Sequence, residues 1–318
     1  MAISRAGCLA FVVVLAVGLS GPAALAEKGK GPPFKDLFIF GDSLSDTGNL
    51  FALTNGLLPA TTPPYFEGRF SNGPLWVQAL AGFLAINVDF DDNVVLNPLT
   101  NNQAVGGAFT DTRNANAVFD PGVAGTGILG QVASFDDAGG KLRPQDLVIV
   151  WGGANDYIFE PESDPATIVR NLRRAVRQLA ALGGRSFLVP NLPDLGDTPF
   201  ALELGLQQEL NQLTKAHNKR LAVVMAKLAR RLRVQILVLD VNDAFTGLDF
   251  LFANLTVPCI VQDPPNPPFV TGICPLEPDG VPDSTRFGGT LFMDVIHPTT
   301  QAHGLLGAFA FGAVQEGF

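Results

Sequence analysis

Basic residues are scarce in this sequence of 318 residues. Lysine and arginine number 21 against 30 aspartates and glutamates, and the formal net charge is -9 at pH 7. Nucleic-acid binding depends on lysine and arginine contacts to phosphate, so no nucleic-acid partner is expected. The basic cluster from Lys227 to Arg233 follows a helical pattern, and positive charge suits a helix C-terminus.

Long hydrophobic runs are absent after the first 26 residues. Within those residues, Arg5 precedes an apolar core from Cys8 to Leu19, and Ala24-Leu25-Ala26 precedes the charged Glu27. This pattern is typical of a cleaved secretory signal peptide. We therefore expect residues 1–26 to be removed and residues 27–318 to form a single domain without a transmembrane span. The mature protein is expected to be secreted or periplasmic.

Cysteine is rare as well, with three residues in the chain. Cys8 lies in the expected signal peptide, which leaves Cys259 and Cys274 on a proline-rich segment. In an oxidising compartment this pair predicts a disulfide, which would stabilise the fold by about 3 kcal/mol through loop closure. A metal site at the pair would need nearby histidines, and the segment has none. No metal or other cofactor is expected.

Short apolar runs alternate with helical patterns along the chain. The strand candidates are Leu37–Phe40, Leu147–Trp151, Ser186–Val189 and Val234–Leu239, with Ile86–Phe90 as a weaker fifth. Apolar strands separated by helices predict a parallel sheet that is covered on both faces. The expected fold class is α/β, a three-layer α/β/α sandwich with about five parallel strands.

Three longer helices are predicted from apolar periodicity. One spans Pro165–Leu182 with Asp164 as its N-cap, and another pattern runs from Leu206 to Leu228. His217 lies on the apolar stripe of the second helix and is expected to be a core histidine with a hydrogen-bond partner. The third helix covers Thr300–Val314.

Two regions, Phe109–Leu142 and Asn254–Arg286, resist regular assignment. The first is rich in glycine and aspartate, and the second is rich in proline. Long irregular loops in a compact domain often serve as lids or binding walls. Whether these loops form a lid is left open by the sequence.

The segment Gly41-Asp42-Ser43 directly follows the first strand candidate. A serine at the carboxyl end of a strand lies where open α/β sheets place reactive groups. Its hydroxyl becomes an effective nucleophile only with a base, an orienting acid and oxyanion donors. Ser43 is therefore the candidate nucleophile, and Asp42 is interpreted as a turn former.

The chain has three histidines that could act as the base. His217 is assigned to the core, and His303 falls inside the C-terminal helical pattern. Asp294 precedes His297 by three residues, close enough for its carboxylate to accept from the ring N–H and fix the tautomer. We therefore predict His297 as the base and Asp294 as its orienting acid.

Two segments could supply donors to the oxyanion of a tetrahedral intermediate. Asn102–Ala108 contains the pair Gly106-Gly107, which can present a backbone N–H. Gly152–Asp156 follows a strand candidate and offers the side-chain amide of Asn155. Taken singly, each segment is equally compatible with an ordinary turn or helix cap.

Together these segments resemble the GDSL esterase and lipase family, also called SGNH hydrolases. The resemblance spans Phe38 to His297 and rests on four blocks in the family's order: Gly41-Asp42-Ser43-Leu44, Gly106-Gly107, Gly153-Ala154-Asn155-Asp156 and Asp294-Val295-Ile296-His297. Gly68–Gly73 and Asn191–Gly196 also resemble segments of the longer secreted members. The resemblance implies a flavodoxin-like sandwich in which residues 27–318 form a single GDSL/SGNH hydrolase domain.

By that resemblance, Ser43 attacks a carboxylic ester, His297 transfers the proton and Asp294 orients His297. The backbone N–H groups of Ser43 and Gly107 and the amide of Asn155 would hold the oxyanion, with Gly106 as the alternative to Gly107. The implied enzyme is a secreted, cofactor-free serine esterase or lipase that forms an acyl-enzyme. Its partner would be a small-molecule or lipid ester.

Two alternatives are open at this point. Asp42, Asp46 and Asp156 could bind a hard cation in a metal-dependent phosphoesterase. A decayed site would instead leave a non-catalytic carbohydrate- or lipid-binding module. The ester is open too, because short-chain esters, lipids, lysophospholipids and acetylated sugars all fit the resemblance, and the oligomeric state is undetermined.

Overall fold

The structure is a computed structural model that describes residues 34–59, 64–261, 270–271, 274–275, 283 and 289–318. Residues 32–318 form one compact unit. The expected signal peptide, residues 1–26, lies outside the described residues. Among the helices of the described part, none has the length and apolar character that a membrane span requires.

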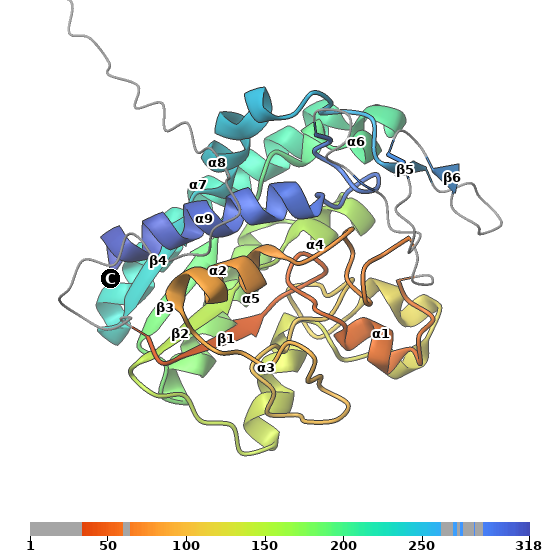
Figure 1. The fold of residues 1–318 in the computed structure, drawn as a ribbon. Coiled ribbons are helices and arrows are strands. Elements are labelled where there is room, and N and C mark those ends of the chain that lie inside the picture. The colour runs from red at the N-terminus through yellow and green to blue at the C-terminus, as the bar shows by residue number, and fades with distance from the viewer. Residues whose placement is uncertain (1–33, 60–63, 262–269, 272–273, 276–282, 284–288) are drawn as a thin grey trace, which may run out of the picture. The chain divides into compact units, whose positions relative to one another are not determined.

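A parallel four-stranded sheet forms the centre of this unit (Figure 1). Its strands, in spatial order, are β1 (Asp36–Phe40), β2 (Asp146–Val150), β3 (Ser186–Pro190) and β4 (Gln235–Leu239). The four main strand predictions match these bounds to within one residue at each end. Strands β2 and β3 are buried along their whole length, which explains why their sequences are apolar throughout.

The fifth strand predicted at Ile86–Phe90 does not form. Ile86, Val88 and Phe90 instead pack irregularly against the core on one face of the sheet. A polar segment, residues 101–105, follows the free edge of β1 in their place. The Ile39 N–H donates to the Asn101 carbonyl at 2.8 Å, and the Gln103 N–H donates to the Ile39 carbonyl at 2.8 Å. Because this edge segment contains asparagines and a glutamine, a search for apolar runs does not detect it.

This edge segment makes β1 a switch point of the topology. After β1 the chain runs along one edge of that strand, and it then crosses to pair with the other edge as β2. In open parallel sheets, ligands bind in the crevice at the carboxyl ends of the strands beside such a switch point. Gly41, Asp42 and Ser43 directly follow β1 at this position.

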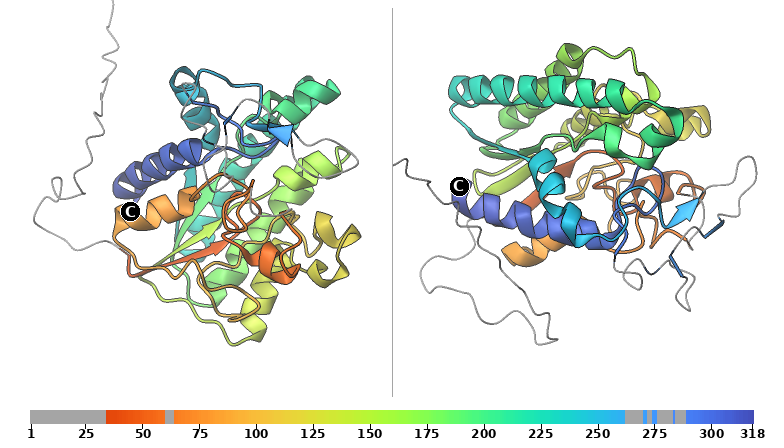
Figure 2. Two further views of the ribbon diagram at one scale, coloured as in Figure 1. Left: turned by 45° about the vertical axis from the view of Figure 1, so that its right-hand side comes forward. Right: turned by 90° about the horizontal axis from the view of Figure 1, so that it is seen from above.

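Helices cover both faces of the sheet, which gives the expected three-layer α/β/α sandwich (Figures 1 and 2). One face carries α2 (Trp76–Leu84) and α9 (Thr300–Gly317), which pack together, and the other carries α3 (Ile128–Asp137), α5 (Pro165–Ala181) and α7 (Gln207–Leu232). As predicted, α5 begins with Asp164 as its N-cap, whose side chain accepts the Ala166 N–H at 2.9 Å.

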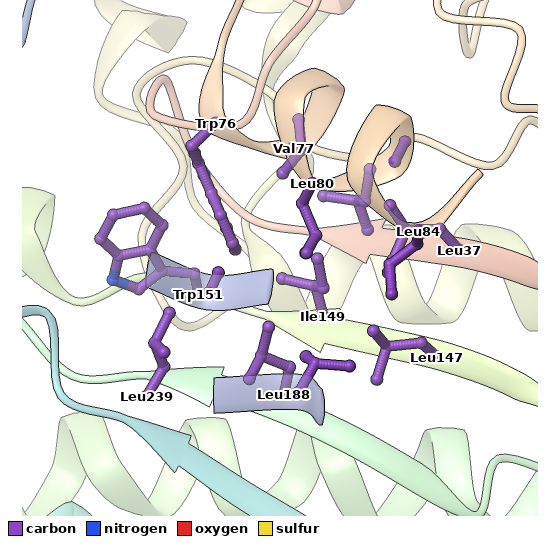
Figure 3. Packing of buried hydrophobic residues seen from close by; sticks show 14 of the residues in the cluster. Leu37, Trp76, Val77, Leu80, Leu84, Leu147, Ile149, Trp151, Leu188 and Leu239 are labelled. Atoms are coloured by element: carbon purple, nitrogen blue, oxygen red, sulfur yellow. The ribbon is translucent and has the colours of Figure 1, made fainter. Parts of the chain in front are cut away.

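The core between α2 and the sheet contains every second side chain of β2, because successive side chains of a strand point to opposite faces of the sheet. Trp76 and Leu80 of α2 point toward Ile149 and Trp151 at the sheet (Figure 3). The rings of Trp76 and Trp151 meet edge to face, with centroids 5.3 Å apart. This packing supports the carboxyl ends of the strands, where the polar segments of the sequence converge.

The remaining elements mostly surround that end of the sheet. They are the helices α1 (Asn49–Leu53), α4 (Ala154–Phe159), α6 (Pro199–Leu204) and α8 (Val241–Leu248), the short 3-10 turns η1 (Ala115–Val118), η2 (Pro121–Val123), η3 (Leu195–Asp197) and η4 (Asp249–Leu251), and the antiparallel pair β5 (Ile260–Val261) and β6 (Val270–Thr271). The region Phe109–Leu142, which was expected to be irregular, therefore contains α3, η1 and η2.

Candidate active site

Ser43, His297 and Asp294 form one chain of hydrogen bonds. Ser43 Oγ lies 2.8 Å from His297 Nε2, and His297 Nδ1 lies 2.7 Å from Asp294 Oδ2. Each residue is 7% exposed, so the chain is shielded from water but reachable. A carboxylate that accepts from Nδ1–H leaves Nε2 as the acceptor for the serine proton. This geometry can activate a serine hydroxyl as a nucleophile.

Asp294 itself holds the turn Asp294–His297, with the predicted acid and base at its ends, in shape. Asp294 Oδ1 accepts the N–H groups of Ile296 at 2.9 Å and of His297 at 2.8 Å, which leaves Oδ2 for the imidazole. Burial opposes the charge of this carboxylate, but the charge of His297 and the hydrogen bonds around it lower the pKa of Asp294. Asp294 is therefore ionised at neutral pH, as an orienting acid must be.

Ser43, the predicted nucleophile, lies in a turn that Asp42 shapes. Asp42 Oδ1 accepts the Leu44 N–H at 3.1 Å, and the Asp42 carbonyl accepts the N–H groups of Ser45 and Asp46 at 3.0 Å each. Gln131 of α3 holds the residue before this turn: its Oε1 accepts the Gly41 N–H at 2.9 Å and its Nε2 donates to the Gly41 carbonyl at 2.7 Å. The carboxyl end of β1 is thus fixed from both sides.

The buried carboxylate of Asp46 joins the nucleophile loop to the glycine pair. Asp46 accepts the N–H groups of Gly48 and Asn49 on Oδ1 and those of Leu50 and Gly106 on Oδ2. The contact with Gly106 is 2.7 Å long, so that N–H is engaged inside the protein. Of the two glycines, Gly107 is the one whose N–H has no acceptor among the described residues.

Gly107 occupies a conformation that favours glycine. Its φ is +78°, and an added Cβ would lie 2.3 Å from Asn116 Nδ2 and 2.8 Å from Asn114 Oδ1. The same two asparagines donate to the Gly106 carbonyl at 3.1 Å and 2.9 Å. The glycine pair is therefore held in a rigid turn, which is what a preorganised donor needs.

Asn155 lies in the first turn of α4 and lines the same cavity as Ser43 and His297. Its Nδ2 donates to the Ala108 carbonyl at 2.9 Å, directly after the glycine pair. One N–H of the amide is thereby fixed, and the second is left for a ligand. The three residues predicted to hold the oxyanion, Ser43, Gly107 and Asn155, are therefore linked by hydrogen bonds between their segments or by a shared cavity.

The cavity beside Ser43 has a volume of about 80 Å³. Its walls are mainly apolar and include Leu44, Trp151, Ile158, Leu195, Phe245, Phe292, Ile296 and Leu306. Pockets of this kind bind apolar groups and orient them through a few polar ones. The cavity therefore suits the hydrocarbon part of a substrate whose polar centre meets Ser43.

The other two histidines are buried apart from this chain of hydrogen bonds. His217 of α7 is fully buried, with Nδ1 3.0 Å from the Tyr157 hydroxyl, and burial lowers the pKa of His217 to about 3. His303 of α9 is 1% exposed, and burial together with the charge of His297 lowers the pKa of His303 to about 3. Both are neutral at pH 7, and the prediction of His217 as a partnered core histidine is confirmed.

The carboxylates considered as metal ligands are engaged separately. Asp46 accepts backbone N–H groups, whereas Asp156 accepts the Thr110 N–H at 3.0 Å and the Thr110 hydroxyl at 2.8 Å. Burial raises the pKa of Asp42 to about 6 and the pKa of Asp156 to about 7. Within the described part of the chain, no three acidic, histidine or cysteine side chains come together as a metal site. Asp42 and Asp46 shape the loop after β1 and Asp156 holds Thr110, so the phosphoesterase alternative lacks a ligand set among the described residues.

Cys259 and Cys274 form a disulfide next to the turn Asp294–His297, which is named the catalytic turn after the predicted roles of Asp294 and His297. The N–H groups of Cys259 and Ile260 donate to the carbonyls of Phe292 and Met293, each at 2.9 Å. The disulfide-bonded segment is thus hydrogen-bonded to the two residues that directly precede Asp294. It supports the backbone from which Asp294 and His297 project.

Sequence reasoning missed Gln131 and Tyr65. Gln131 lies in a region that carried no recognised helical pattern, so no sequence feature marked it. The Tyr65 hydroxyl donates to Asp294 Oδ2 at 2.7 Å. Its position just before Gly68–Gly73, a segment noted for its resemblance to the longer secreted GDSL members, is the signal that could have found it.

The family is established by comparison with known proteins. The model of the GDSL-like lipase/acylhydrolase family matches residues 37–309, which include Ser43, Asp294 and His297. The chain is 31% identical to the phosphatidylcholine-sterol acyltransferase of Aeromonas hydrophila over 66% of this chain and 59% of that protein, so it spans less than two thirds of that relative. It is 25% identical to a GDSL esterase/lipase of Arabidopsis thaliana over 96% of each chain.

Among solved structures, an aryl esterase of M. smegmatis aligns with a TM-score of 0.47 and 19% identity over 89% of this chain and 100% of that one. The family match covers most of the sequence, from β1 into α9. The chain belongs to the GDSL-like lipase/acylhydrolase family.

Proposed function

We propose that this protein is a serine hydrolase that cleaves carboxylic esters through an acyl-enzyme on Ser43. The observation that carries the proposal is the chain of hydrogen bonds from Ser43 through His297 to Asp294, with heavy-atom distances of 2.8 Å and 2.7 Å. Membership of the lipase/acylhydrolase family supports ester hydrolysis as the reaction class. The apolar cavity beside Ser43 supports a substrate with a hydrocarbon group.

In the proposed reaction, Ser43 Oγ attacks the ester carbonyl while His297 Nε2 takes its proton. The negative charge that develops on the carbonyl oxygen is held by the N–H groups of Ser43 and Gly107 and by the amide of Asn155. His297 then returns the proton to the leaving alcohol, and the acyl group remains on Ser43. Water attacks the acyl-enzyme by the same route, releasing the acid and restoring the serine.

A fluorophosphonate probe and a series of p-nitrophenyl acyl esters test the proposal together. The wild type should react with the probe at Ser43 and turn over the esters, whereas Ser43→Ala should lose the label and about 10⁴-fold or more in kcat. Ser134→Ala, an exposed serine on α3, is the matched control and should behave as wild type. A folded Ser43→Ala variant with wild-type turnover would refute the assignment and favour another chemistry. A wild type that neither takes up the probe nor turns over the esters would favour a binding module.

Acyl transfer is a second candidate reaction at the same serine. One relative, at 31% identity, is named an acyltransferase, and an alcohol can attack an acyl-enzyme in the place of water. Product analysis in the presence of an added long-chain alcohol separates the two reactions. Release of free acid alone assigns hydrolysis, whereas a new ester assigns transfer.

We also infer that the chain is exported and cleaved after Ala26. The apolar pattern of residues 1–26 and the disulfide between Cys259 and Cys274 support this inference, because disulfides persist in oxidising compartments. N-terminal sequencing of exported protein should begin at Glu27, and an intact N-terminus on that protein would contradict cleavage.

A further inference from the structure

A short segment early in the chain lies against the catalytic turn along its length. This segment, Tyr65–Asn72, is called the clamp here. Its contacts with the turn and the start of α9 are the Tyr65 hydroxyl with Asp294 Oδ2 at 2.7 Å, the Phe70 ring with the His297 ring at a centroid distance of 4.7 Å, the Ser71 hydroxyl with the Pro298 carbonyl at 3.0 Å, and Asn72 Oδ1 with the Thr300 N–H at 2.9 Å. The two segments therefore contact each other in the same residue order.

The clamp is itself held in shape. The Phe66 N–H donates to the Ser71 carbonyl at 2.9 Å, which closes the segment into a loop. Arg69 is buried, and its side chain donates to the Glu67 carbonyl at 3.0 Å and to Gln78 Oε1 at 3.0 Å, which ties the loop to α2. A loop braced in this way can fix the position of groups that it contacts.

Tyr65 reaches the oxygen on which the imidazole depends. Asp294 Oδ2 lies 2.7 Å from the Tyr65 hydroxyl and 2.7 Å from His297 Nδ1, so both groups share one acceptor atom. The tyrosine is 6% exposed, and burial together with the charge of Asp294 raises the pKa of Tyr65 well above its ordinary value. The phenol therefore keeps its proton and acts as a donor at neutral pH.

We propose that Tyr65 is a positioning residue for the reaction, through which the clamp orients Asp294 and hence His297 toward Ser43. The proposal rests on the proposed ester hydrolysis at Ser43 and adds a residue from a separate part of the chain to it. Tyr65 prevents rotation of the Asp294 carboxylate, and the stacked Phe70 ring prevents tilting of the imidazole.

The test compares Tyr65→Phe with Tyr157→Phe, because these are the two tyrosines of the chain. Tyr157 is also buried and its hydroxyl also contacts a histidine, His217, but it lies outside the catalytic chain. We expect Tyr65→Phe to lower kcat about tenfold with little change in KM, the loss of one charge-assisted hydrogen bond. Tyr157→Phe should leave both kcat and KM unchanged.

The outcomes separate this proposal from the proposed function. If Ser43→Ala is inactive and folded Tyr65→Phe keeps the wild-type kcat, the role of Tyr65 is refuted while ester hydrolysis stands. If Ser43→Ala stays active, the reaction at Ser43 itself is refuted. Should Tyr65→Phe fail to fold, Phe70→Leu tests the same clamp: a lower kcat at constant KM supports it, and an unchanged kcat overturns it.

Discussion

Replacing Gly107 with alanine tests the turn that is proposed to present an oxyanion donor. Alanine at a φ of +78° costs about 1 to 2 kcal/mol of backbone strain. Its Cβ would also lie 2.3 Å from Asn116 Nδ2, so the turn must shift. Overpacking of this kind costs about 1 to 3 kcal/mol in addition. A shifted turn moves the Gly107 N–H away from the oxyanion. Loss of one such donor lowers kcat about 100- to 1,000-fold.

The control is Gly205→Ala, at the C-cap of α6. Gly205 has a similar φ of +70°, but an added Cβ would meet no atom within 4 Å. Urea unfolding should show about 1 to 2 kcal/mol of destabilisation in Gly205→Ala and more in Gly107→Ala. In the ester assay, Gly205→Ala should keep the wild-type kcat. If Gly107→Ala also keeps kcat within about threefold of wild type, the Gly107 N–H is not a donor to the transition state.

Two predictions concern stability around the site. The pKa of His303 is about 3 in the fold against 6.5 in the unfolded chain. As the pH falls below 6.5, the unfolded state therefore binds a proton before the folded state does, and the free energy of unfolding decreases. Between pH 7.5 and pH 5, the free energy of unfolding should therefore fall by about 2 kcal/mol more in the wild type than in His303→Leu. Urea unfolding with the same pH dependence in both proteins would contradict this. Removing the disulfide as Cys259→Ser with Cys274→Ser should cost about 3 kcal/mol and lower kcat, since the segment supports Asp294. Two free thiols in mass spectra of the exported protein would count against that bond.

The strands were predictable because each is an apolar run between helical patterns. Leu147–Trp151 and Ser186–Val189 stand out in the sequence since β2 and β3 are buried on both faces. The same criterion failed at the edge of the sheet. Ile86–Phe90 is apolar because it covers the core, whereas the segment that pairs with β1 carries Asn101, Asn102 and Gln103. At an edge, pairing depends on backbone groups, which side-chain hydropathy does not report.

The hydrogen-bonded set of Ser43, His297 and Asp294 was predictable because the proposed chemistry restricts its members to few residue types. The chain has three histidines, and one of them follows an aspartate at a spacing that permits a hydrogen bond. The supporting residues could not be found in this way. Tyrosine, glutamine and aspartate occur throughout proteins without marking a site. The contacts of Tyr65 and Gln131, and the contact of Asp46 with Gly106, depend on partners that are distant in the sequence.

By itself, the sequence determined the four strands of the sheet, the long helices α5, α7 and α9 and the position of Gly41-Asp42-Ser43 after β1, and it predicted His297 with Asp294 as base and acid. It named Gly107 as the backbone donor and left Gly106 as the alternative. Only the tertiary structure showed that Asp46 accepts the Gly106 N–H, which leaves Gly107. It also brought Tyr65 onto Asp294. The reason is physical: local patterns report which side chains a segment buries, whereas a hydrogen bond between distant segments exists only once packing has placed donor and acceptor within about 3 Å.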